Sequence, residues 1–400
     1  MINKKKLSII LVVLAFGLFQ FVSNAYAHDK GFSTGFILSD SKGNILLSQN
    51  KDKQFIPASI LKILTSLAAI QILGPDYHFS TEYKFDKRSK NLYVRGKGDP
   101  LFISEEIARF CKQISLSIPT RQINNIILDN RFFSEQIHIP GKGDSLNPYD
   151  AIVGALCANF NTINFRWDSQ KNCFISGEPQ TPLLSIFNNE IQKTNLKEGR
   201  IVLTEHQSRL YPGFLIKYFL EENNIQVSGN ILLNENNNSE QNLSFLSSYQ
   251  LTDVIKKLLE FSNNFIANQL LLTLGASQYG EPATLDKGIN VLKSFADDLN
   301  LKKISIFEGS GLSRSNRISP EQMQNILIKF MPYFTLLKKN GTDYFKTGTL
   351  TDVRTRAGYI TGKNNTLYPY TILVNQKNAD YTFIHNKLIK MVGNIENDLD

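Results

Sequence analysis

The sequence is poor in cysteine, and beyond its N-terminal segment it lacks a long apolar run. Its three cysteines are Cys111, Cys157 and Cys173, and their spacing fits no zinc-binding pattern. In an oxidising compartment two of them can pair, or all remain thiols; neither alternative gives them a catalytic role. No later segment approaches the ~20 apolar residues of a membrane span. A basic run with interleaved aromatic residues is also missing, so nucleic-acid binding is not indicated.

The N-terminal segment has the three parts of a secretory signal peptide. A basic segment, Lys4-Lys5-Lys6, precedes an apolar segment from Leu7 to Val22, and Ala25-Tyr26-Ala27 forms an A-x-A cleavage site. The alternative is a membrane anchor, but the apolar segment is short and Gln20 interrupts it. We therefore predict that residues 1–27 are a signal peptide and that the exported chain keeps no stable membrane anchor.

Removal of this segment takes away three lysines and no acidic residue, so the formal net charge falls from +8 to +5. A modest positive excess suits an anionic polymer such as a cell wall. The same charge is also ordinary for a soluble protein. Net charge therefore does not identify a partner.

The remaining 373 residues (400 minus 27) are too many for one small core and indicate two domains. Residues 28–78 contain a predicted β-hairpin, with strands at 35–38 and 44–47, and then a helix. Residues 243–400 contain helical patterns at 251–274, 285–299 and 320–337, and strands at 356–360 and 370–374. We predict that these two segments form one discontinuous domain of helices and a sheet.

The segment between them, residues 79–242, has a different character. Short predicted strands at 80–85, 91–96 and 123–128 alternate with polar turns. An asparagine-rich tract from Asn234 to Asn242 is typical of an exposed linker. We predict a β-rich inserted domain that includes this linker.

One serine begins an apolar helical run in a context that suits nucleophilic catalysis. The pattern S-x-x-K occurs as Ser39–Lys42, Ser48–Lys51 and Ser59–Lys62. The first two lie in polar, turn-like sequence, whereas the third opens the run from Pro57 to Ile70. Residues three apart share a helix face, so Lys62 lies beside Ser59. A lysine whose pKa is lowered by burial and by another cation can take the proton of a serine hydroxyl.

Two further motifs follow in order along the chain. Ser262-Asn263-Asn264 is an S-x-N motif that interrupts a helical pattern, and Lys346-Thr347-Gly348 is the single K-T-G triplet. Each motif alone has an ordinary explanation: Ser59 as a helix N-cap, the second motif as a turn, the third as the start of a strand. Their joint occurrence in this order favours a catalytic site.

The first two motifs, together with the lysine of the third, supply the groups for proton transfer. Lys62 is the base, and Lys346 is the second cation that lowers its pKa. Ser262 relays a proton to the departing amine. Asn264 holds both Lys62 and the amide of the substrate.

The third motif supplies groups for binding. Lys346 and Thr347 bind a free carboxylate, and Gly348 carries no side chain to obstruct a substrate at the strand edge. The oxyanion needs two backbone N–H donors, which we assign to Ser59 and Thr349.

The ordered set S-x-x-K, S-x-N and K-T-G resembles that of penicillin-binding proteins and serine β-lactamases. Further segments resemble the D-alanyl-D-alanine carboxypeptidase/endopeptidase family, the class C low-molecular-mass penicillin-binding proteins. They are Gly96-Lys97-Gly98-Asp99-Pro100, the G-S-G-L-S-R segment at 309–314, and residues 346–351 running on to 357–359. The resemblance implies an α/β (α+β) fold of the serine β-lactamase/DD-peptidase transpeptidase type, an antiparallel sheet flanked by helices, with an inserted domain.

The resemblance also implies the chemistry. Ser59 is acylated by peptidoglycan peptides in the periplasm, and β-lactams are covalent inhibitors. No cofactor or metal is implied. Asp144 resembles the family's acidic contact to the side-chain amine of the peptide's diamino acid, and is otherwise an ordinary surface carboxylate. Arg314 is a second candidate for that pocket.

Three positions depart from the family pattern. Glu308 stands where Asp is usual, Asn268 where an acidic residue commonly follows the S-x-N helix, and Thr351 where some relatives have Gln. They leave the preference between carboxypeptidase and endopeptidase substrates open. The C-terminal stretch from Lys387 to Val392 is too short for the amphipathic membrane helix of other carboxypeptidase classes.

Two other functions stay as alternatives. A β-lactamase needs efficient deacylation, and no dedicated deacylating acid stands in a recognisable motif. A catalytically silent wall-binding protein does not require both lysines of the motifs. The sequence therefore predicts a serine-type D-alanyl-D-alanine carboxypeptidase, DD-endopeptidase or both.

Overall fold

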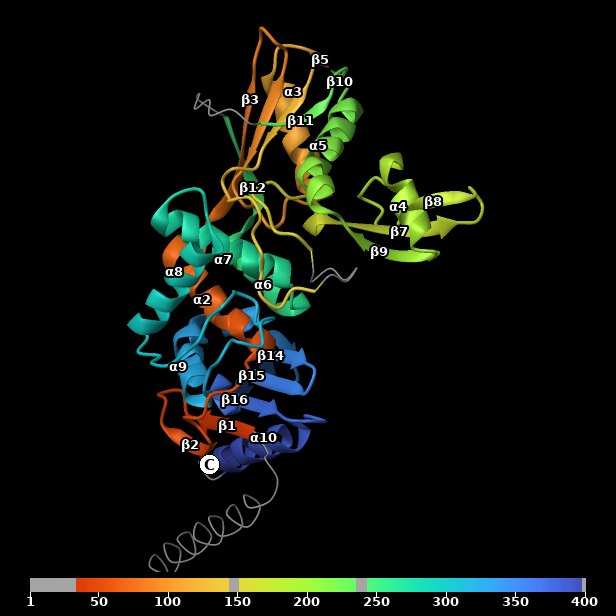
Figure 1. The fold of residues 1–400 in the computed structure, drawn as a ribbon. Coiled ribbons are helices and arrows are strands. Elements are labelled where there is room, and N and C mark those ends of the chain that lie inside the picture. Colours follow the sequence, from red (N-terminus) through yellow and green to blue (C-terminus); the bar gives the residue numbers. More distant parts are fainter. Residues whose placement is uncertain (1–33, 144–150, 235–242, 398–400) are drawn as a thin grey trace, which may run out of the picture.

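The computed structural model describes residues 34–143, 151–234 and 243–397. Figure 1 shows one sheet with its helices at one end of the molecule and the segment inserted between α2 (Lys62–Leu73) and α6 (Leu251–Phe261) at the other. The predicted signal peptide, residues 1–27, lies outside the described residues. No helix in the described part of the chain is long and apolar enough to cross a membrane.

A six-stranded sheet joins the two ends of the described chain. Its order is β13-β14-β15-β16-β1-β2, and each neighbouring pair is antiparallel. The strands are β1 Thr34–Ser39, β2 Ile45–Gln49, β13 Lys338–Asn340, β14 Asp343–Leu350, β15 Val353–Thr361 and β16 Leu367–Asn375. The predicted hairpin is β1 with β2, and the two predicted C-terminal strands are β15 and β16, so these predictions are confirmed.

Helices cover both faces of this sheet. Alternate residues of a strand point to opposite faces, and here apolar residues of both faces are buried. Ala357 and Tyr359 join a large apolar core on one face, whereas Ile360 and Tyr370 pack with the C-terminal helix on the other. The helices are α2 Lys62–Leu73, α6 Leu251–Phe261, α7 Asn264–Tyr279, α8 Leu285–Asp298, α9 Pro320–Phe330 and α10 Thr382–Asn397. The C-terminal helix α10 is longer than the stretch at 387–392 suggested, and its apolar side lies against the sheet.

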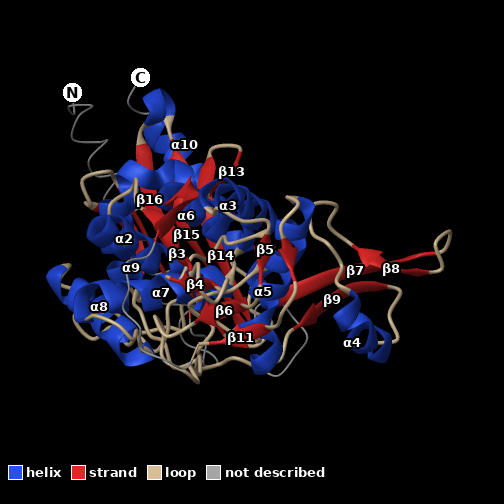
Figure 2. Cartoon of the chain, turned by 90° about the horizontal axis from the view of Figure 1, so that it is seen from above, coloured by secondary structure: helices blue, strands red, loops and turns tan. Residues whose placement is uncertain are grey.

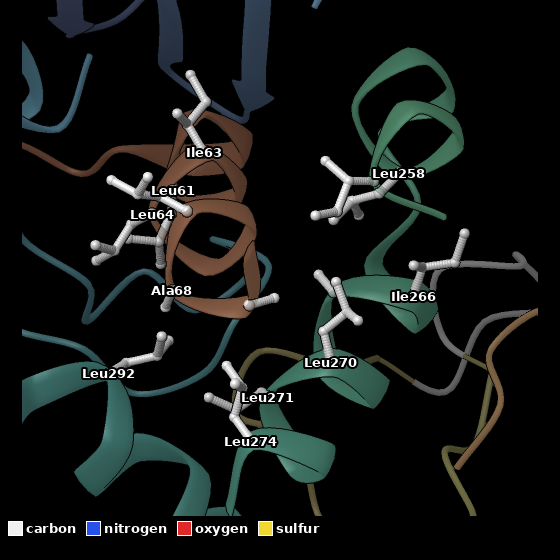
Figure 3. Close-up of a cluster of buried hydrophobic side chains, with 14 of the residues drawn as sticks. Leu61, Ile63, Leu64, Ala68, Leu258, Ile266, Leu270, Leu271, Leu274 and Leu292 are labelled. Atoms are coloured by element: carbon white, nitrogen blue, oxygen red, sulfur yellow. The ribbon is translucent and has the colours of Figure 1, made fainter. Parts of the chain in front are cut away.

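The helix α2 lies at the centre of the large core. Its residues from Lys62 to Ile70 are all buried, and so are those of α7 from Asn264 to Ala276. Figure 3 shows this cluster, in which Ala68 of α2 lies next to Leu292 of α8, and Leu271 and Leu274 of α7 lie nearby. A helix that is surrounded on every side is fixed by packing, so the first residues of α2 and α7 are held in place.

The inserted segment forms further sheets and its own core. A five-stranded sheet has the order β11-β6-β4-β3-β12, and β8-β7-β9 is a separate sheet that projects from the molecule (Figure 1, Figure 2). The strands are β3 His78–Phe85, β4 Leu92–Gly96, β5 Gln122–Ile123, β6 Ile126–Asp129, β7 Thr162–Asp168, β8 Cys173–Ser176, β9 Glu198–Val202, β10 Gln226–Val227, β11 Ile231–Leu233 and β12 Leu243–Gln250. The predicted strands at 80–85 and 91–96 are present as β3 and β4, whereas the one predicted at 123–128 is divided into β5 and β6. We did not predict the helices of this segment, α3 Ser104–Ser117, α4 Asn188–Lys193 and α5 Glu205–Glu222.

The strand β12 pairs with β3, although it follows the asparagine-rich tract. One cluster of buried apolar side chains draws only on residues between Tyr83 and Phe245. We therefore propose a division into an inserted domain that extends to Gln250, slightly past the predicted boundary at 242, and a discontinuous domain. The three cysteines are free thiols; Cys111 and Cys157 are buried and Cys173 is exposed.

Candidate active site

Ser59 lies in a tight turn that precedes α2. The turn is a 3-10 helix, η1, over Ala58–Leu61. Ala58 has a φ of 48°, in the left-handed region that alanine rarely adopts, so surrounding contacts must hold the turn. One such contact comes from β15, where Thr355 Oγ1 donates to the Pro57 carbonyl at 2.7 Å. Ser59 itself is half-buried.

Two glycines allow other elements to approach this turn. A Cβ on Gly348 of β14 would lie 2.8 Å from the Ser59 nitrogen, and a Cβ on Gly311 would lie 1.9 Å from the Ala58 carbonyl oxygen. We predicted that Gly348 keeps the strand edge open to substrate. That role stays a prediction, and the contacts add a second one, because the missing side chain also makes room for the nucleophile turn.

Lys62 is fully buried, and its amino group is surrounded by oxygen atoms. The Nζ atom lies 2.9 Å from Ser59 Oγ, and it donates to Asn264 Oδ1 at 2.7 Å and to the Ser310 carbonyl at 2.7 Å. A neutral amine has two N–H groups and one lone pair. The amide and carbonyl oxygens can only accept, so the lone pair is left to face the Ser59 hydroxyl. This arrangement suits transfer of the Ser59 proton to Lys62.

The surroundings of Lys62 favour the neutral amine. Burial lowers the pKa of Lys62 well below its usual value, and the charge of Lys346 lowers it further. The carboxylate of Glu308 opposes the shift by raising the pKa. Burial and a second cation are the two causes that the sequence suggested, whereas the contribution of Glu308 was not foreseen.

The S-x-N segment lies at the break between α6 and α7. Ser262 ends α6 with a φ of 55°, and Asn263 caps α7 because its side chain accepts from the Ile266 N–H at 3.1 Å. The break places Asn264 in the first turn of α7, where it is buried against Lys62. Ser262 is half-buried.

The strand β14 forms the other side of the site. Lys346 is buried, and its Nζ donates to the Thr347 carbonyl at 2.8 Å. Burial lowers the pKa of Lys346 to about 8, and the charge of Lys338 adds to the shift. Thr347 is half-buried and Thr349 is exposed. A buried lysine and an accessible threonine therefore lie together on this strand.

The outer edge of β14 is open where the K-T-G motif lies. The short strand β13 pairs with β14 only from Asp343 to Phe345. Within the described residues, no strand pairs with the outer edge from Lys346 to Leu350. An open edge of this kind accepts an extended peptide as an added strand.

The two predicted contacts for the diamino acid have different outcomes. Arg314 is exposed, and its Nη1 donates to the Thr351 carbonyl at 2.8 Å. It therefore lies at the turn between β14 and β15, close to the strand side of the site. Asp144 lies outside the described residues, so its role stays a prediction.

Comparison with known proteins places this arrangement in a family. The model of the D-Ala-D-Ala carboxypeptidase 3 (S13) family matches residues 22–198 and 194–337. The chain belongs to the S13 family. It is therefore a serine peptidase.

The relatives of this S13 peptidase match it over different fractions of its length. The D-alanyl-D-alanine carboxypeptidase of Actinomadura sp. (strain R39) is 22% identical over 74% of this chain, which spans 64% of that enzyme's length. DacB of Haemophilus influenzae is 21% identical over 86% of each chain. The crystal structure of penicillin binding protein 4 (dacB) from that organism has a TM-score of 0.73 and 19% identity over 93% of this chain and 97% of that one.

A third similar structure is a penicillin G-acylated predatory endopeptidase from Bdellovibrio bacteriovorus. It has a TM-score of 0.54 and 16% identity over 92% of each chain. At these identities the solved structures show the fold. They confirm the predicted fold class, an antiparallel sheet flanked by helices with an inserted segment.

One important part of this S13 site was missed from the sequence. We noted Glu308 only as a departure from the family pattern, but it is fully buried beside the G-S-G-L-S-R segment. It accepts hydrogen bonds from the Ser310 and Gly311 N–H groups at 2.7 Å each, and the Ser310 carbonyl is one of the acceptors of Lys62. An acidic residue directly before a turn rich in glycine and serine is the signal that would have found it.

Proposed function

We propose that this S13 peptidase is a serine-type D-alanyl-D-alanine carboxypeptidase and DD-endopeptidase. It acts on peptidoglycan stem peptides through an acyl-enzyme on Ser59. The observation that carries the proposal is the buried Lys62 amino group, 2.9 Å from Ser59 Oγ and with two other acceptors for its N–H groups. Relatives described as carboxypeptidases and as an endopeptidase support the two reactions.

Acylation begins when Ser59 Oγ bonds to the carbonyl carbon of the penultimate D-alanine and Lys62 takes the hydroxyl proton. The N–H groups of Ser59 and Thr349 stabilise the oxyanion. The proton passes from Lys62 through Ser262 to the departing nitrogen as the C–N bond breaks. The departing amine is D-alanine in the carboxypeptidase reaction and the crosslinked side-chain amine in the endopeptidase reaction.

Deacylation restores the enzyme. A water molecule attacks the acyl carbon and gives a proton to Lys62, which returns one to Ser59 Oγ as the ester bond breaks. The sum of both stages is hydrolysis of one peptide bond. Asn264 serves both stages, because its amide oxygen holds Lys62 in place at 2.7 Å.

Recognition uses the strand side of the site. The substrate peptide adds to the open edge of β14, where Lys346 and Thr347 bind its terminal carboxylate. The diamino acid carries an amine and a carboxylate on its side chain. Asp144 suits the amine, and the guanidinium of Arg314 suits the carboxylate.

A β-lactam reacts at the same serine, and we propose β-lactams as covalent inhibitors. In this proposal residues 1–27 are a signal peptide that is cleaved after it has directed the chain to the periplasm, where the substrate lies. A β-lactamase hydrolyses its acyl-enzyme quickly, whereas the proposed peptidase should release the bound β-lactam slowly. The rate of release therefore distinguishes the two functions.

The test combines labelled penicillin with mass spectrometry of muropeptides. We expect the native protein to be labelled and Ser59→Ala to remain unlabelled. Loss of terminal D-alanine marks the carboxypeptidase reaction, and conversion of crosslinked dimers to monomers marks the endopeptidase reaction. Labelling that survives Ser59→Ala would refute the proposed nucleophile.

A further inference from the structure

The turn that follows Glu308 is wrapped around a carboxylate to which the proposed reaction gives no role. Glu308 is 0% exposed. Its Oε2 accepts from Ser310 N at 2.7 Å and from Ser310 Oγ at 2.5 Å, and its Oε1 accepts from Gly311 N at 2.7 Å and Ser313 N at 3.2 Å. One side chain thus satisfies most of the donors of a buried turn.

Two amide side chains hold the same carboxylate from outside the turn. Asn316 Nδ2 donates to Oε1 at 2.8 Å, and Asn268 Nδ2 donates to Oε2 at 3.4 Å. Asn268 also accepts from Gly309 N at 2.9 Å and donates to the Asn264 carbonyl at 3.2 Å. The turn is therefore tied to α7 one helical turn after the asparagine that holds Lys62. The two departures from the family pattern, at 268 and 308, are in contact with each other.

The turn reaches the reacting atoms through one carbonyl group. Ser310 O accepts from Lys62 Nζ at 2.7 Å, and Gly311 lies directly against the backbone of the nucleophile turn. We propose that Glu308 is a positioning residue for acylation, because its carboxylate fixes the turn that aligns Lys62 with Ser59. This inference rests on the proposed acylation of Ser59.

The charge of Glu308 also acts on Lys62. Among the described residues, the charged groups that act on Lys62 are Lys346 from β14 and Glu308 from the turn. The anion stabilises the protonated lysine and so raises its pKa, against burial and Lys346. Loss of the anion therefore lets Lys62 act as a base at lower pH. Loss of alignment, by contrast, lowers the acylation rate at every pH.

The experiment measures the rate of acylation by labelled penicillin against pH for the native protein and Glu308→Gln. Glutamine keeps the shape, removes the charge and turns an NH₂ group toward N–H donors. We expect the maximal rate to fall by about tenfold or more and the acid limb of the profile to move by about one pH unit to lower pH. A limb that does not move, or a rate that does not fall, overturns the inference.

A matched control is Glu106→Gln in the inserted segment. Glu106 is also buried, and it accepts from Ser248 N at 2.8 Å and Ser248 Oγ at 2.5 Å. We expect this variant to lose stability without moving the acid limb. An equal shift in Glu106→Gln would show that the effect does not come from Glu308 and would overturn the inference.

A second variant covers the case in which Glu308→Gln does not fold. Ser310→Ala removes the 2.5 Å hydrogen bond from Oγ to the carboxylate and keeps the charge. We expect about tenfold slower acylation with an unmoved limb, and an unchanged rate would overturn the inference. Failure of the native protein to acylate at Ser59 would refute the proposed function instead.

Discussion

Lys62 and Lys346 are both buried, but the two sides of the site hold them differently. On the helical side, formed by η1, α2 and α7, Lys62 Nζ lies within hydrogen-bond distance of three oxygen atoms from three parts of the chain. On the strand side, formed by β14, Lys346 donates to the carbonyl of its neighbour Thr347 and lies beside an open strand edge. The helical side is complete without a ligand, whereas the strand side leaves donors available for one.

This difference assigns separate work to the two sides. Proton transfer needs fixed distances between donor and acceptor, and the contacts of Lys62 provide them. Recognition needs polar groups that a ligand can satisfy. Substitutions on the helical side should therefore change the acylation rate constant, and substitutions on the strand side should change the affinity.

The largest effect is expected for Lys62→Ala. Loss of the base slows acylation by about 10³-fold, while the affinity of the non-covalent penicillin complex changes little. Rapid-mixing measurement of labelling separates the two quantities. Lys42→Ala, which changes the exposed lysine of another S-x-x-K pattern, is the control and keeps the native rate. A large loss of affinity in Lys62→Ala would break the division between the two sides.

The next largest effect is expected where the two sides touch. A methyl group at Gly348 meets Ser59 N at 2.8 Å and Thr355 Oγ1 at 2.3 Å. We expect Gly348→Ala to slow acylation by about 10²-fold and to lower the free energy of unfolding by about 1–3 kcal/mol. Urea unfolding and labelling measure the two effects. Gly393→Ala, inside α10 and with open space around the added carbon, should keep the native acylation rate and should raise the free energy of unfolding by about 0.5–1 kcal/mol.

In a plot of acylation efficiency against pH, Lys62 should determine the acid limb and Lys346 the alkaline limb. Lys62 must lose its proton to act, so acylation efficiency rises with pH on the acid side. Lys346 must keep its proton to bind a carboxylate, and burial lowers its pKa to about 8. Efficiency therefore falls as pH rises through about 8, by up to about tenfold per unit. The arginine of Lys346→Arg stays charged, so this variant should move only the alkaline limb, to higher pH. If the alkaline limb stays in place, it reports the titration of another group.

The smallest effect is expected for Thr347→Ala. In the proposed binding mode the half-buried hydroxyl donates one hydrogen bond to the carboxylate of the ligand, so its loss should lower the affinity by about fivefold. The rate constant at saturation should stay the same. Thr342→Ala, an exposed threonine on the turn before β14, is the control. A fall in the rate constant would show that Thr347 takes part in the acylation step and does not act in binding alone.

Short motifs could predict the parts of the site that depend on local spacing. Ser59 and Lys62 are three residues apart at a helix start, and the break at Ser262 interrupts a clear helical pattern, so both were visible. Glu308 had one local signal, its place directly before the glycine- and serine-rich turn, but its contact with Asn268, forty residues earlier in the chain and on another element, could not be predicted. Long-range contacts of this kind leave no local pattern.

The missed helices of the inserted segment have two different causes. In α5, Pro212 and Gly213 stand inside the helix and are buried; both disfavour helix locally, and tertiary packing overrides them. In α3, the buried Ile107, Phe110, Cys111 and Ile114 follow helical spacing. That signal was present and was masked by the short strands around it.

The hydrogen bonds that prepare Lys62 also determine when the chain becomes reactive. They join residues 202 and 248 positions apart, and Lys346 is made later still. Contacts between such distant residues form late, after the intervening segment has found its place. A growing or partly folded chain therefore carries Ser59 as an ordinary hydroxyl. The reactivity proposed for Ser59 is therefore acquired only when folding is nearly complete, which protects the unfinished chain from acylation.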